Sequence, residues 1–141
     1  MAELNIVEKV IALEAVDLLK NLKPDQLSRI ASIATEVTLP PGKTVLEPDQ
    51  PSEALFVVLD GAVEISGSDG KPIHTARQND VLGTWALFDA EPMPIRATSV
   101  EDTKLLRIAR DDFYDLLSDN MEITASIFAI LVKRFRQMVG Q

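Results

Sequence analysis

Residues 83–100 have the sequence GTWALFDAEPMPIRATSV and lie between two segments with the pattern of β-strands. A glycine, a short apolar turn and a proline-containing loop lead from one strand to the next, which is how a chain forms a small pocket. Backbone amides in the turn after Gly83 would lack helical partners, and such amides attract anions. We therefore expect the functional segment here, although it lacks the charged residues that such a pocket normally uses.

The segments on either side of this stretch have strand periodicity. From Val37 to Ile108 the apolar period falls from about 3.6 residues toward 2, with frequent Gly, Pro, Asn and Asp. Asp60-Gly61 is a hairpin signal between two apolar runs. Many short strands with regular turn signals indicate an all-β sandwich or barrel. Its expected core residues are Leu46, Phe56, Val58, Val63, Leu87 and Leu105.

Helical periodicity flanks the strands on both sides. Residues 3–22 have the pattern of one amphipathic helix, and a second helix begins at Pro24, a favoured first-turn residue. Near the C-terminus, Asp119 or Asn120 is placed to cap a final long helix. The apolar positions expected in the first two helices are Leu4, Val7, Ile11, Leu18, Leu22, Leu27, Ile30, Ala31 and Ala34. Those of the last helix are Ile123, Ile127, Ile130, Leu131, Phe135 and Met138.

The composition narrows the class of protein. A chain of 141 residues is expected to form one domain. A net charge of −8 disfavours nucleic acid or an anionic membrane as a partner. The chain has no cysteine, which excludes disulfides and thiol catalysis. No apolar run approaches the roughly 18 residues of a membrane span, and the N-terminus lacks a basic signal-peptide start, so we expect a cytoplasmic location.

The sequence contains no pattern typical of a catalytic or metal site. It has no nucleophile elbow, no glycine-rich phosphate loop with a lysine, and no histidine–acid pair. His74 is the single histidine and lies in a strand-like segment, so we interpret it as a surface strand residue rather than a metal ligand. We expect no catalytic residues, no metal and no cofactor, and hence no enzyme.

Four segments together resemble the cyclic nucleotide-binding domain shared by the catabolite activator protein, protein kinase A regulatory subunits and gated channels. Residues 18–27, LLKNLKPDQL, are similar to the family's entry helices, and residues 40–65 are similar to its first hairpins. Residues 79–87, NDVLGTWAL, are similar to the approach to its phosphate-binding cassette. Residues 101–117, EDTKLLRIARDDFYDLL, match its last strand and following helix.

The resemblance implies a mainly β fold with flanking α-helices. It is a double-stranded β-helix, also called a jelly roll or β-roll, with N-terminal helices and a C-terminal helix pair. We expect a single domain over residues 1–141. Its expected parts are N-terminal helices 1–35, a roll 36–109 with a cassette 83–100, and C-terminal helices 110–141.

The start of the cassette matches the family only in part. Family members begin it with Gly-Glu-x-Ala-Leu, and the resemblance assigns the glutamate to the ribose hydroxyl. Gly83, Ala86 and Leu87 match, but Thr84 stands at the glutamate position. Trp85 replaces a smaller aliphatic residue, and we expect its ring to fill part of the vacant pocket.

The end of the cassette lacks the family's phosphate ligands. Family members have Pro-Arg-Ser/Thr-Ala here, and the arginine pairs with the cyclic phosphate. Counting without gaps from Gly83 places Met93 at the arginine position and Pro94 at the Ser/Thr position. A proline offers neither a hydroxyl nor an N–H group. Arg96 is the one nearby cation, and we interpret it as an exposed strand residue.

The substitutions in the cassette are expected to remove a large part of the binding free energy for a cyclic nucleotide. Hydrogen bonds to charged groups contribute about 1.5–3 kcal/mol each, so their loss removes roughly 4–8 kcal/mol. That corresponds to about a thousandfold to a millionfold in affinity. We therefore expect a degenerate ligand pocket that does not bind cyclic AMP or cyclic GMP in the usual way. Its residues are Gly83, Thr84, Trp85, Ala86, Leu87, Met93, Pro94, Ile95 and Arg96.

Two functional hypotheses remain open at this stage. The first is a regulatory or interaction module that acts through its terminal helices, either as a homodimer or on a partner or parent protein. The chain also resembles domains attached to bacterial transporters, which would tether it in a larger membrane-associated protein. Self-association is expected through Ile123, Ile127, Ile130, Leu131 and Phe135. The second hypothesis is a small-molecule sensor that takes a cyclic nucleotide or an uncharged ligand between Thr84, Met93, Pro94 and Ile95.

Overall fold

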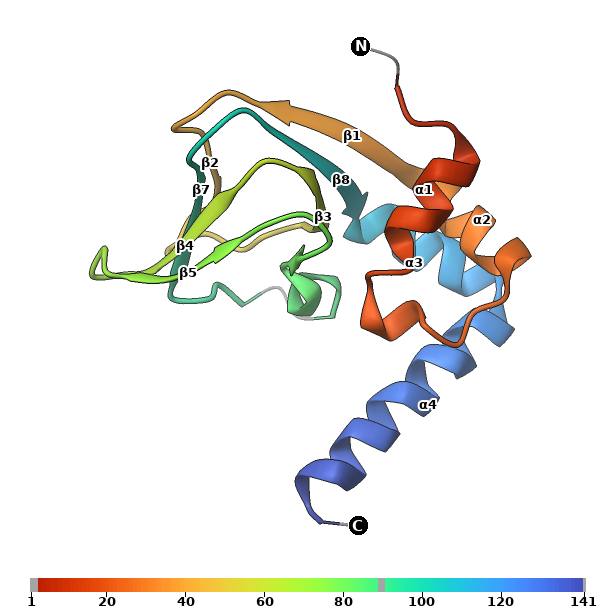
Figure 1. Cartoon of the computed structure of the whole chain (residues 1–141). Helices are drawn as coiled ribbons and strands as arrows, with labels where there is room; N and C mark the ends of the chain where they lie inside the picture. The colour runs from red at the N-terminus through yellow and green to blue at the C-terminus, as the bar shows by residue number, and fades with distance from the viewer. Residues whose placement is uncertain (1–2, 89–90, 141) are drawn as a thin grey trace.

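The computed structural model describes residues 3–88 and 91–140, without the side chain of Trp85. In this part of the chain, helices gather at one end of a roll made of two antiparallel four-stranded sheets (Figure 1). The first sheet has the order β1-β8-β3-β6 and the second β2-β7-β4-β5. The expected mainly β fold with flanking helices is confirmed.

The strands follow one another along the middle of the chain. They are β1 (Ala34–Leu39), β2 (Thr44–Leu46), β3 (Ala54–Asp60), β4 (Val63–Gly67), β5 (Pro72–Ala76), β6 (Val81–Leu82), β7 (Ile95–Ser99) and β8 (Thr103–Ala109). The helical elements are α1 (Ile6–Leu13), η1 (Asp17–Leu19), α2 (Pro24–Ile33), η2 (Thr84–Leu87), α3 (Arg110–Asp119) and α4 (Met121–Met138). Strand β1 thus begins slightly before the expected start of the roll at residue 36.

Strand β3 is buried on both faces because it separates two apolar clusters. Leu55 and Val57 face the cluster shared with the helices, whereas Phe56 and Val58 face the interior of the roll. A strand buried on both sides reads as a continuous apolar run rather than an alternation. All six residues expected in the core of the roll are buried. Leu46, Phe56, Val58, Val63 and Leu105 lie in the interior of the roll as expected, whereas Leu87 lies in the cluster shared with the helices.

The prediction of a single amphipathic helix over residues 3–22 is wrong. Helix α1 ends at Leu13, and after a turn the chain forms the short η1. Leu13, Leu18 and Leu22 are all buried, but on one continuous helix Leu13 would point away from the other two. The chain breaks the helix so that all three reach the core. Val7 and Ile11, expected on the apolar face, are 66% and 60% exposed.

Two local assignments, the end of the second helix and a hairpin turn, also differ from the sequence-based expectation. Ala34 was expected on the second helix, but it starts β1 and pairs with Ile108 of β8. Asp60-Gly61 is no hairpin loop, because β3 and β4 lie in different sheets. Gly61 has a φ of +96°, and a Cβ there would lie 2.5 Å from the carbonyl oxygen of Asp102. Glycine is needed at this corner for both reasons.

Most of the α4 residues expected to mediate self-association pack on the body of the chain. Ile123, Ile127 and Ile130 are buried in the chain's own core, and Leu131 is half-buried. Four of the five residues expected to mediate self-association are therefore used within the chain, and only Phe135 is largely exposed. Arg134 pairs with Asp17 of η1. Among the described residues, no helix is long and apolar enough to cross a membrane.

Candidate ligand-binding site

The turn between β6 and η2 is formed by the residues that match the family pattern. Gly83 has a φ of +75°, and a Cβ there would lie 3.0 Å from the carbonyl oxygen of Ala54. The Ala86 amide donates to the Gly83 carbonyl at 2.9 Å, which closes the first turn of η2. Ala86 and Leu87 are buried. These residues shape and anchor the segment.

Met93 and Ile95 lie beside a cavity of only about 10 Å³. A single water molecule needs about 10–15 Å³ by this kind of measure, so the cavity has no room for a nucleotide. The lining residues are Leu46, Glu47, Gln50, Ser52, Ala86, Glu91, Met93 and Ile95. Two carboxylates and no lysine or arginine stand in this set, which opposes binding of a phosphate.

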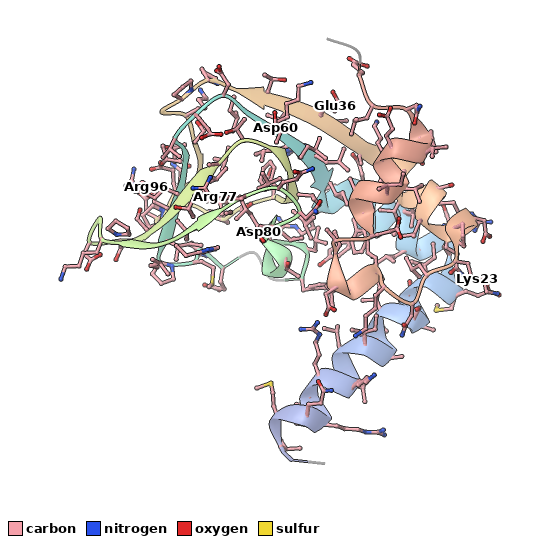
Figure 2. All side chains as sticks on the ribbon, viewed as in Figure 1. Lys23, Glu36, Asp60, Arg77, Asp80 and Arg96 are labelled. Atoms are coloured by element: carbon pink, nitrogen blue, oxygen red, sulfur yellow. The ribbon has the colours of Figure 1, made fainter. Side chains whose placement is uncertain are left out.

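Arg96 lies on β7 with its side chain at the surface. Its guanidinium Nη1 is 3.2 Å from the Glu47 carboxylate, and both side chains are partly exposed. Figure 2 shows Arg96 on the side of the roll away from the helices. The interpretation of Arg96 as an exposed strand residue is therefore confirmed. Its partner is the glutamate that also lines the small cavity.

Thr84 lines a different and much larger space. A cleft of about 620 Å³ lies between η1, the turn before β6, η2 and α4, and both Thr84 and Phe88 border it. Pro94 is exposed at the surface. Met93 and Ile95 thus line the small cavity and Thr84 lines the large cleft, and the single pocket expected between Thr84, Met93, Pro94 and Ile95 stays a prediction. The expectation for Trp85 lies outside the described side chains.

Two contacts that the sequence did not reveal tie the cassette to α3. In the first, the Arg110 guanidinium donates to the Ala86 carbonyl at 3.2 Å. The rings of Phe88 and Phe113 meet edge to face, with centroids 6.4 Å apart. In the sequence, Arg110 and Phe113 read only as the start of a helix. Their role depends on η2 lying beside α3, which local periodicity does not encode.

No metal centre is found in residues 3–88 and 91–140. In that part of the chain, no three His, Cys, Asp or Glu side chains are placed to hold an ion together. His74 lies on β5 and is exposed, which fits its interpretation as a surface strand residue.

The chain is similar to known regulatory proteins over most of its length. Residues 36–120 match the family described as the cyclic nucleotide-binding domain. A cAMP-dependent protein kinase regulatory subunit from Aspergillus fumigatus is 33% identical over 106 residues, which cover 74% of this chain and 26% of that protein. A CRP-like cAMP-activated global transcriptional regulator from Mycobacterium tuberculosis is 23% identical over 122 residues, covering 84% of this chain and 54% of that protein.

A solved structure supports the same fold. The N-terminal domain of a transcriptional regulator from Streptomyces coelicolor A3(2) superposes with a TM-score of 0.83 at 24% identity, covering 90% of this chain and 94% of that one. The chain spans about a quarter of the length of the matched kinase regulatory subunit and about half of the mycobacterial regulator. On the family match and the 33% identity, the chain belongs to the cyclic nucleotide-binding domain family, of the regulatory-domain type.

Proposed function

We propose that this chain is a non-enzymatic regulatory or interaction module whose cassette does not bind cyclic AMP or cyclic GMP in the usual way. The observation that carries the proposal is the environment of Met93. The side chain at the family's arginine position is a thioether beside a cavity of about 10 Å³, and Glu47 and Glu91 line that cavity. The names of the two relatives mention cAMP dependence or activation by cAMP. The proposed lack of nucleotide binding would distinguish this chain from them.

Electrostatics supports this proposal. A cyclic phosphate carries a negative charge, which costs free energy to desolvate unless a cation or several donors meet it. The nearest arginine along the strand, Arg96, is already paired with Glu47. Moving it inward would break this pair and leave Glu47 beside the phosphate.

The terminal helices are the proposed output of the module. Arg110 and Phe113 of α3 contact the cassette directly, and α4 follows α3 after Asn120. A shift of η2 would therefore change the contacts at the start of α3. We propose that α3 and α4 pass such a shift to a second copy, a partner or a parent protein in the cytoplasm.

Calorimetric titration tests the lack of nucleotide binding. With about 100 μM protein and cyclic AMP or cyclic GMP raised to about 1 mM, we expect no saturable heat, since a dissociation constant above 1 mM corresponds to less than about 4 kcal/mol. Linear AMP serves as the matched control. Trp85 is the only tryptophan and lies within the cassette sequence, so its fluorescence gives a second readout. A saturable midpoint in the micromolar range, with no response to linear AMP, would overturn the proposal.

A second candidate function is a sensor for a different small molecule. The observation that favours it is the cleft of about 620 Å³ beside Thr84 and Phe88, which has a volume typical of ligand sites of roughly 300–1,000 Å³. Its walls include Val16, Leu18 and Leu131, which suit an apolar ligand. Native mass spectrometry of the gently purified protein tests this. A retained small molecule supports the sensor, and an empty protein argues against it.

A further inference from the structure

The cleft of about 620 Å³ is walled by elements that are distant in the sequence. Val16 and Leu18 line it from η1 and the residue before it, Val81 from β6, Phe88 from the end of the cassette turn, and Leu131 from α4. Among the described residues, its lining shares no member with that of the small cavity beside the family's arginine position. The cleft is therefore a separate space with apolar walls and a volume suited to a small organic molecule.

Three charged side chains also line the cleft, namely Asp17, Asp80 and Arg134. Arg134 of α4 pairs with Asp17 of η1, and the Lys20 ammonium lies 3.7 Å from the same Asp17 carboxylate. These two cations compensate the charge of Asp17. An anionic ligand that approached Arg134 would have to separate it from Asp17 and would then lie beside that carboxylate. This end of the cleft therefore does not favour an anion.

Asp80 differs from Asp17 because no lysine or arginine of the described residues forms an ion pair with it. Its Oδ2 accepts from the Arg77 amide at 2.8 Å, and within residues 3–88 and 91–140 its other oxygen has no donor. The backbone around it is fixed to β3, since the Val58 amide donates to the Asp80 carbonyl at 2.9 Å. Figure 2 shows Asp80 where the roll meets the helical end of the molecule. A carboxylate oxygen with capacity for a donor is thus held at the edge of an apolar space.

We propose that this cleft binds an apolar organic cation, a small molecule with an aromatic or aliphatic body and one protonated amine. The body lies among Val16, Leu18 and Leu131, and the amine donates to Asp80. The inference rests on the second candidate function, a small-molecule sensor, and gives the class of ligand that this sensor takes. It does not depend on the lack of nucleotide binding at the small cavity.

Charge complementarity selects a cation over the alternatives. An ammonium group forms a charge-assisted hydrogen bond with a carboxylate, whereas a neutral ligand leaves Asp80 to water and a carboxylate ligand is repelled by it. The net charge of −8 also raises the concentration of cations near the protein surface. The apolar contacts supply most of the affinity, because an ion pair with an exposed carboxylate changes an affinity by only about twofold to fivefold. The amine therefore selects and orients the ligand.

Two dansyl dyes with the same fluorophore and opposite charges test the proposal. Dansylcadaverine ends in a primary amine and dansylglycine in a carboxylate, and dansyl emission rises in apolar surroundings. We expect saturable binding of dansylcadaverine to the purified chain with a midpoint below about 100 μM. Dansylglycine is expected to bind about tenfold more weakly, since an attraction is replaced by a repulsion. No saturable binding of dansylcadaverine, or equal binding of both dyes, overturns the proposal.

An amide in place of the carboxylate tests the role of Asp80. Asp80→Asn keeps an oxygen acceptor for the Arg77 amide but removes the charge, so it should weaken dansylcadaverine binding about twofold to fivefold. The matched control is Asp69→Asn, because the exposed Asp69 carboxylate likewise accepts a backbone amide but does not line the cleft. This control is expected to change the affinity by less than about twofold. Equal effects of the two variants contradict the pairing of the amine with Asp80.

A variant that fills the space tests the place of binding. Ala15 is half-buried and lines the cleft, so the ring of Ala15→Phe should weaken binding of dansylcadaverine by about tenfold or more. Ala129→Phe is the control, because Ala129 is exposed on α4 and does not line the cleft. Circular dichroism checks the fold of each variant. Unchanged affinity in folded Ala15→Phe overturns the proposal, and if this variant does not fold, the comparison of Asp80→Asn with Asp69→Asn decides.

Cyclic AMP distinguishes failure of this inference from failure of the proposed lack of nucleotide binding. Addition of about 1 mM cyclic AMP is expected neither to release dansylcadaverine nor to give saturable heat. Saturable heat with the dye retained overturns the lack of nucleotide binding alone, and absence of dye binding overturns the inference alone. Release of the dye by cyclic AMP would place the nucleotide in the cleft and overturn both. Native mass spectrometry tests the sensor function separately, since it asks whether the protein retains a molecule from the cell.

Discussion

The cassette and α4 use similar apolar residues in opposite ways. At the cassette, Met93 and Ile95 border a cavity of about 10 Å³, and Arg96 is paired. On α4, Phe128 and Phe135 are more than half exposed. The small cavity beside Met93 holds little space, whereas α4 presents large exposed apolar side chains. This difference agrees with the proposal that the chain acts through a protein surface rather than through binding of a nucleotide.

Helix α3 connects these two regions. Arg110 holds the Ala86 carbonyl, and Phe113 meets Phe88 at the end of the cassette turn. Phe113 is 1% exposed and lies in the same cluster as Ile123 and Ile127 of α4. A change at Phe113 is therefore expected to affect both the cassette turn and the packing of α4.

The largest effect is expected from Phe113→Ala. Removing a fully buried phenyl ring costs about 3–5 kcal/mol in the free energy of unfolding, since it leaves a cavity between η2, α3 and α4. Urea unfolding followed by circular dichroism measures this loss. Tyr114→Ala is the matched control, because the neighbouring Tyr114 side chain is exposed and its loss is expected to cost less than about 1 kcal/mol. Equal losses in both variants would contradict the linking role of Phe113.

Repair of the cassette is expected to have the next largest effect. The triple change Thr84→Glu, Met93→Arg and Pro94→Ser supplies the ribose acceptor, the phosphate cation and the hydroxyl that the family pattern has. If the loss of binding resides only in these three positions, we expect the midpoint for cyclic AMP to fall from above 1 mM to about 10 μM by calorimetry, a gain of about 2.7 kcal/mol.

Single changes serve as the controls for the repair. Each is expected to bind little, because an isolated arginine is desolvated without the rest of the cradle and Glu47 and Glu91 compete for it. If the folded triple variant stays inert, the cavity itself is closed, and adding Trp85→Leu is the next change. An inert quadruple variant would place the divergence beyond the cassette residues.

The smallest effect is expected from the surface pair of Arg96 and Glu47. A double-mutant cycle with Arg96→Ala and Glu47→Gln should give a coupling energy of about 0.2–1 kcal/mol, because both side chains are partly exposed. The coupling should weaken when the salt concentration is raised. A coupling well above 1 kcal/mol would show that Arg96 has a role beyond this ion pair.

Local patterns predicted much of the fold because they report burial directly. The continuous apolar run in β3 predicted a buried strand, and Phe56 and Val58 were placed correctly in the core. Gly83 was identified by its family position, and its positive φ agrees with that assignment. The absence of an arginine at Met93 also follows from counting along the sequence alone.

Other features depend on elements that are distant in the sequence. Periodicity predicted one helix over residues 3–22, but Leu13 and Leu22 must reach the same core from opposite helical faces. Asp60-Gly61 has the local chemistry of a hairpin, but the sheet to which β4 belongs is decided by pairing with β5 and β7. Local helix and turn preferences are overridden where long-range pairing buries more apolar surface.

The sequence by itself determined the family, the strands of the roll, the glycine turn of the cassette, and that Thr84 and Met93 stand where the family pattern has Glu and Arg. Only the tertiary structure decided that Thr84 lines the large cleft and Met93 the small cavity. It also decided that Arg110 and Phe113 join the cassette to the helices, and that Phe128 and Phe135 rather than Ile123 and Ile127 are exposed. The physical reason is that α4 is apolar on two faces. Its sequence specifies both stripes, but only packing against η1 and α3 selects which one the chain buries.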